Sequence, residues 1–99
     1  MPKGLIHSKD DDVCVVTNDV KKGDEVICAY LENPSSYVII KSEDDIPLGH
    51  KIALRDIKKG EKVLKYSRPI GVAISDIRKG EHVHIHNLKS LRWGKWQSQ

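Results

Sequence analysis

Short runs of β-branched and apolar residues, separated by turn residues, recur along most of the chain. Such runs are typical of β-strands. We therefore predict strands over residues 13–17, 26–31, 37–40, 62–66, 71–74 and 82–86, with breaks at 32–36, 47–49 and 68–69. No segment carries a sustained helical stripe, and the best helical candidate is a single turn near residues 42–46. Short strands with frequent turns predict a compact, mostly-β fold.

An eight-residue pattern occurs three times, over residues 19–26, 56–63 and 76–83. Its order is Asp, an aliphatic residue, two basic residues, Gly, an acidic residue, any residue and Val. The uneven spacing of the copies excludes a solenoid of fixed period. In each copy we expect the aliphatic residue to enter a core, the basic pair to occupy a solvated turn, and Gly to supply a positive φ. The Val is then the first inward residue of a strand.

The third copy leads into a histidine-rich segment in which His82, His84 and His86 alternate with Val83 and Ile85. In a strand, alternate side chains share a face, so we predict three imidazoles on one face and the two aliphatic side chains in a core. Imidazole binds metals and acts as an acid or base near neutral pH. Two alternatives stay open: a merely solvated face, or a His-rich tract that binds metal adventitiously. All three imidazoles reach one ion only if the strand bends or bulges.

Composition and charge narrow the class of protein. The chain has 99 residues, 38% hydrophobic and 31% charged, which predicts one globular domain with a modest core. The net charge of +3 is spread along the chain. The one candidate for nucleic-acid contact, residues 89–95, lacks the charge density that phosphate binding requires. No signal peptide and no apolar run long enough to span a membrane occur, so we expect a cytoplasmic protein with no nucleic-acid or membrane partner.

The two cysteines, Cys14 and Cys28, lie in apolar runs predicted to be strands. Their spacing fits no Cys-x-x-Cys metal or redox motif. In a cytoplasmic protein the simplest expectation is two buried, reduced thiols that pack as small hydrophobic side chains.

Three segments together resemble the altronate/galactarate dehydratase family: residues 45–61, residues 63–66 with 70–71, and residues 79–87. In that family these segments belong to an N-terminal SAF-type domain. The resemblance implies a β-clip fold and covers residue 12 to about residue 93. We accordingly divide the chain into an N-terminal segment (1–11), a SAF-type domain (12–88) and a C-terminal tail (89–99).

The resemblance also implies a function. The large domain of the long family members is missing, so the chain resembles the small subunit of a lyase built from two polypeptides. Such an enzyme removes water from a sugar acid such as altronate, or sulfite from sulfolactate. The implied partners are a large lyase subunit and a small anionic hydroxy acid, and the implied cofactor is Fe²⁺ or Mn²⁺. The competing expectation is a stand-alone SAF-type module that binds a carbohydrate or a protein without catalysis.

Four histidines are candidates for the site. We expect His84 and His86 to face metal or substrate, with His82 as a further metal ligand. His50 follows a Pro-Leu-Gly turn and is the third catalytic candidate, although a turn histidine often only bonds to nearby backbone.

Two further polar residues are candidates for substrate binding. Lys51 is expected to steer an anionic substrate, with a solvated surface lysine as the alternative. Asn87 is expected to bind a substrate hydroxyl or orient a histidine, or else to close a turn.

The tail carries Trp93 and Trp96. Aromatic side chains are enriched at protein interfaces, so we expect this polar tail, frayed on a free monomer, to dock on the large subunit. The alternative is that the two rings fold back over the small core.

Overall fold

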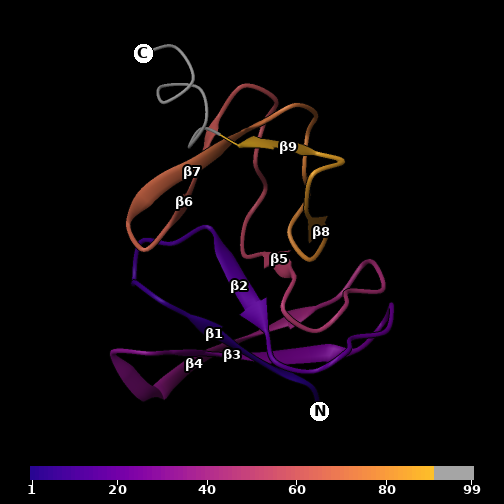
Figure 1. Cartoon of the computed structure of the whole chain (residues 1–99). Helices are drawn as coiled ribbons and strands as arrows, with labels where there is room; N and C mark the ends of the chain where they lie inside the picture. Colours follow the sequence, from indigo (N-terminus) through magenta and orange to yellow (C-terminus); the bar gives the residue numbers. More distant parts are fainter. Residues whose placement is uncertain (91–99) are drawn as a thin grey trace.

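The computed structural model describes residues 1–90, which form two β-sheets and contain no helix (Figure 1). The strands are β1 (Lys3–Ile6), β2 (Val13–Val16), β3 (Glu25–Tyr30), β4 (Asn33–Lys41), β5 (Lys51–Ala53), β6 (Lys62–Lys65), β7 (Arg68–Ala73), β8 (His82–Val83) and β9 (Leu88–Ser90). The predicted mostly-β fold is therefore confirmed. The helical turn expected near residues 42–46 is wrong, because the buried Ser42 hydroxyl donates to the Asp44 carbonyl and the segment bends instead. Within residues 1–90, no helix is long and apolar enough to cross a membrane.

The larger sheet has the strand order β4-β3-β1-β2-β5-β8, and the smaller sheet has the order β6-β7-β9. Strand β1 lies between β3 and β2, parallel to the first and antiparallel to the second. Residues 3–6, which we had assigned to a separate N-terminal segment, thus form part of the larger sheet.

Two hydrophobic clusters lie on either side of strands β2 and β5. Cys14 and Ile52 pack into one cluster, and their neighbours Val13 and Ala53 pack into the other. Because both faces of these strands are buried, the run at residues 13–16 is apolar throughout rather than alternating.

The three-copy pattern behaves as predicted. The glycines at its fifth position, Gly23, Gly60 and Gly80, have φ of 94°, 91° and 91°. All six aliphatic residues at its second and eighth positions are buried: Val20, Val26, Ile57, Val63, Ile77 and Val83.

The structure also contains a fourth copy, over residues 45–52, which sequence analysis missed. It keeps Asp45, a buried Ile46, Gly49 with φ of 86°, and a buried Ile52, but lacks the basic pair and the acidic residue. The sequence signal for this copy is the Asp-aliphatic-x-x-Gly-x-x-aliphatic spacing, which is visible only when the basic and acidic positions of the pattern are left unspecified.

The four copies associate in two reciprocal pairs. Val20 forms an antiparallel bridge with Ile46, and Ile57 forms one with Ile77. Within each pair, the first Asp of one copy accepts a hydrogen bond from the fourth backbone N–H of the other. The four bonds are Lys22 N to Asp45, Leu48 N to Asp19, Lys59 N to Asp76 and Lys79 N to Asp56, each 2.8–2.9 Å long. The repeat therefore has a structural role, because within each pair it holds the turns of two copies together.

Several predicted strand boundaries are wrong. Pro34 and Pro69, interpreted as breaks, lie within β4 and β7. β4 is an edge strand, where a missing N–H is tolerated, and Pro69 lies at a register shift beside Leu64. Residues 89 and 90 belong to the tail that we expect to fray, but they are part of a strand, because Leu88–Ser90 forms β9 and pairs with β7. Trp93 and Trp96 lie outside the described residues.

Cys14 and Cys28 form a disulfide, so the expectation of reduced thiols is wrong. The cysteines lie on β2 and β3, which flank β1, and their Cα atoms are 6.2 Å apart, a separation that a disulfide spans. Between them lies Gly4, where a β-carbon would overlap the Cys14 sulfur. The strand order that brings the cysteines together is non-local and left no signal in their spacing.

Candidate active site

The histidine strand ends earlier than predicted. β8 stops at Val83, and residues 84–87 form a turn. Asn87 closes this turn: its Oδ1 accepts a hydrogen bond from His84 N at 3.0 Å, and its Nδ2 donates to His82 O at 2.7 Å. Only 7% of Asn87 is exposed. The structure thus gives Asn87 the turn-closing contacts we had kept as the alternative, and through them Asn87 holds the backbone of both histidines.

The turn changes where the alternating side chains point. Ile85 is 81% exposed, so its predicted place in a core is wrong. His86 is exposed, with its ring centroid 5.2 Å from that of His82. The three alternating imidazoles therefore do not share the face of one strand.

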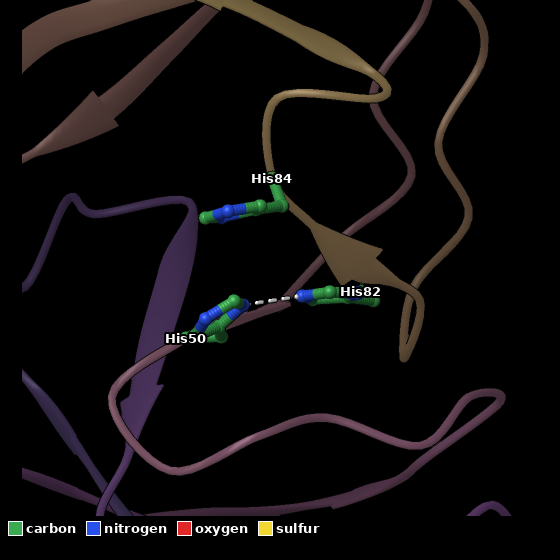
Figure 2. A group of neighbouring side chains, drawn as sticks. All are labelled: His50, His82 and His84. Carbon is green, nitrogen blue, oxygen red and sulfur yellow. Dashed lines mark hydrogen bonds between the residues drawn. The ribbon is translucent and has the colours of Figure 1, made fainter.

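A different trio converges. His50, His82 and His84 point toward one another from the start of β5 and the end of β8 (Figure 2). One ring nitrogen from each lies within 4.8 Å of the others. The His50 Nδ1 and His82 Nε2 atoms are 2.9 Å apart, and the His50 and His84 rings stack with centroids 4.1 Å apart.

The repeat explains how His50 becomes available. In the other three copies the acidic sixth residue turns back and accepts a hydrogen bond from the N–H of the third residue. These pairs are Asp24 with Lys21, Glu61 with Lys58 and Glu81 with Arg78. In the fourth copy the third residue is Pro47, which has no N–H, and the sixth is His50. The position that caps the turn elsewhere here supplies an imidazole to the cluster.

His82 occupies the unrestricted seventh position of the third copy. Its backbone lies opposite Ile52 in the pairing of β5 with β8, and its N–H donates to Asp44 Oδ2 at 2.9 Å. The pairing of β5 with β8 and the Asp44 carboxylate therefore hold the backbone of His82 in place.

Burial and the neighbouring positive charges lower the pKa of both His82 and His84. Burial lowers the pKa of His82 to about 4, and positive charge on His50, His86 and His84 contributes in the same direction against a smaller opposing effect of Asp44. Burial first, and then His50, Lys51 and His86, also lower the pKa of His84. A neutral imidazole has a free lone pair for a metal ion or for a proton.

The donor set fits a divalent metal. Two nitrogens bound to one ion at usual bond lengths lie roughly 3.3 Å apart in a tetrahedral arrangement, so small side-chain rotations suffice to bring the three onto one ion. Imidazole suits iron as well as zinc, copper and nickel. The fitting set is His50, His82 and His84, whereas we had predicted His82, His84 and His86.

Lys51 lies next to this cluster and is half-buried rather than fully solvated. Burial, followed by the charge of Lys65, lowers the pKa of its ammonium group. Together with His84 it lines an open groove of about 470 Å³. Lys51 is therefore placed to meet a small anion beside the histidines.

Comparison with known proteins gives a match to a family model. Residues 2–91 match the altronate/galactarate dehydratase SAF domain. The chain belongs to this family. The match includes strand β1 and reaches beyond both ends of the 12–88 range that we had assigned to the SAF-type domain.

Relatives of two kinds are similar to this SAF-domain chain. The (2R)-sulfolactate sulfo-lyase subunit alpha of Chromohalobacter salexigens is 38% identical over 90% of the chain and 95% of that subunit. Its counterpart from Paracoccus pantotrophus is 38% identical over 82% of the chain and 98% of that subunit. Altronate dehydratase of Bacillus subtilis is 46% identical over 86% of the chain, which spans only 16% of that dehydratase.

The lowered pKa of His82 predicts a loss of stability in acid. Its imidazole takes up a proton near its ordinary pKa of 6.5 in the unfolded chain, but only near about 4 in the folded chain. Between these values the unfolded state holds more protons, so stability falls as the pH falls through this window. We expect Tm, followed by circular dichroism, to decrease over that window, and to decrease less in His82→Gln. If Tm fell equally with pH in the wild type and in His82→Gln, protonation of His82 would not be the origin of the acid sensitivity.

Proposed function

We propose that this chain is the small subunit of a lyase and contributes histidines to a metal-dependent β-elimination site that it shares with a large subunit. The observation that carries the proposal is the convergence of three imidazoles on one point, in a family whose named relatives include sulfo-lyase subunits and dehydratases. The substrate is a small hydroxy acid, from which water or sulfite is removed.

In this reaction a proton leaves one carbon of the substrate and the leaving group departs from the adjacent carbon. A base takes the proton α to the carboxylate, the C–H electron pair becomes the new double bond, and the β C–O or C–S bond breaks with its electrons going to the leaving group. Departing hydroxide takes up a proton and leaves as water, whereas sulfite leaves as an anion. Histidine suits the proton-transfer role at neutral pH.

We assign four roles to the residues of the site. His50, His82 and His84 are the proposed holders of Fe²⁺ or Mn²⁺, which when bound supplies Lewis-acid polarisation of the substrate carboxylate. His86 lies outside this trio and is exposed at its rim, so its imidazole is the proposed acid–base group. Lys51 binds the anionic substrate, and Asn87 positions the backbone of His82 and His84.

Purification of the tagged full chain from its native host tests the proposal. We expect a large dehydratase-like polypeptide to co-purify, and the eluate to release water from altronate or sulfite from sulfolactate. A parallel purification with the tag alone identifies proteins that bind the resin. Recovery of the chain without such a polypeptide, and without elimination activity, would contradict the subunit role.

A further inference from the structure

The hairpin between β6 and β7 is strained. Tyr66 and Ser67, its two central residues, have φ of 57° and 59°. Two-residue hairpin turns with positive φ at both positions normally use Asn or Gly, because other side chains are unfavourable there. Strain of this kind persists only where the surrounding structure enforces it, and it concentrates at binding and catalytic sites.

A buried carboxylate enforces this turn. Asp11, only 7% exposed, accepts hydrogen bonds from Tyr66 N at 3.0 Å and from Ser67 N at 2.8 Å, and a further one from Ser8 N. The preceding segment of the chain therefore holds the hairpin tip in its unfavourable conformation.

The same hairpin carries a second local cost. Lys65 and Arg68 lie directly opposite each other in the pairing of β6 with β7. Like charges at such positions repel. Within residues 1–90 no carboxylate forms an ion pair with either side chain, and the Lys65 ammonium lies 4.8 Å from the centre of the Tyr66 ring. An anion between the two cations would relieve the repulsion.

Both cations line the groove that contains Lys51 and His84. The groove lies between the two sheets: Lys51 and His84 belong to the β5 and β8 side, and the hairpin supplies the opposite wall. No acidic residue lines it among the described residues. Three cations with no carboxylate form a site for more than one negative charge.

We propose that Lys65 and Arg68 form a second-anion subsite, which selects small hydroxy acids that carry two anionic groups. One anionic group faces Lys51 and the histidine cluster, and the other, a carboxylate or a sulfonate, lies between Lys65 and Arg68. The planar guanidinium of Arg68 can pair with two oxygens of such a group, and Lys65 adds a point charge. This inference rests on the proposed function, since it concerns the substrate of that site.

Titration of the ¹⁵N-labelled full chain, followed by NMR at constant ionic strength, tests the subsite. The probes are malate and 3-sulfolactate, which have two anionic groups, and lactate, a hydroxy acid with one. We expect malate and 3-sulfolactate to shift the amides of residues 65–68 and 84, and to bind roughly tenfold more tightly than lactate. Equal affinity for malate and lactate, or shifts confined to other residues, would overturn the proposal.

Charge-neutralising variants separate the subsite from the overall charge. Arg68→Gln, or Lys65→Gln if the first loses its native spectrum, is expected to weaken malate binding by roughly tenfold and to leave lactate binding unchanged. Lys59→Gln removes the same charge from an exposed turn outside the groove and is expected to change neither affinity. An equal loss of malate affinity in Lys59→Gln would show that net charge alone is responsible, and would overturn the proposal.

The binding experiment also distinguishes failure of the subsite from failure of the proposed function, because it requires no turnover. Selective malate binding with no elimination activity in the purified complex would retain the subsite and contradict the lyase role. Elimination activity without selective binding of dianions would support the lyase role and contradict the subsite.

Discussion

His84→Ala is expected to lower turnover of the two-subunit complex by at least about a hundredfold, the lower range for loss of a catalytic group. His84 stacks on His50 and offers one of the three converging nitrogens, so its removal leaves two ligands for the metal. The measurement is kcat for water or sulfite release, after gel filtration has verified that the variant still binds the large subunit. Unchanged turnover would mean that this domain only clamps its partner.

His86→Ala separates the two roles by metal content rather than by turnover, because it removes an imidazole from the same turn but not from the converging trio. We expect turnover to fall by about a hundredfold through loss of proton transfer, with metal content retained. Loss of metal in His86→Ala would instead return His86 to the ligand set that the sequence alone suggested.

Gly80→Ala is expected to destabilise the fold by about 3 kcal/mol, which lowers Tm by on the order of 15 °C. Its φ of 91° is unfavourable for alanine, and a β-carbon at this position would overlap the Lys41 carbonyl oxygen. Gly80 lies two residues before His82, so the same change displaces the start of β8.

Gly60→Ala provides the comparison, because Gly60 has the same φ of 91° at the same position of its copy. Within residues 1–90, no heavy atom beyond its two chain neighbours lies within 4 Å of the added carbon. We expect a loss of only about 1–2 kcal/mol, from the backbone conformation alone. Thermal melts of the two variants give the difference. Equal losses would show that the approach of Lys41 to Gly80 costs nothing.

The local features of the fold were predictable and the non-local ones were not. Each copy of the repeat contains its own turn, core residue and strand start, so the buried positions of Ile57 and Val63 follow from a few neighbouring residues. By contrast, the disulfide depends on β1 entering the sheet between β2 and β3, which no spacing between Cys14 and Cys28 encodes.

The same contrast between local and non-local features explains why only part of the candidate site was predicted. The alternation at residues 82–86 identified a histidine-rich segment, but the expected shared face required a strand that continues past Val83. Asn87 ends that strand by bonding back to His82 and His84, and the third member of the trio comes from a distant turn. His50 could have been placed by comparing residues 45–52 with the other copies, since Pro47 removes the N–H that their acidic residue binds.

The metal content of the purified two-subunit complex tests the central claim most directly. By inductively coupled plasma mass spectrometry, we expect about one iron or manganese ion for each copy of this chain in the wild-type complex. We expect almost none in His50→Ala or in His84→Ala, with the complex intact in both. A full complement of metal in those variants would contradict the assignment of the His50–His82–His84 cluster as the metal site.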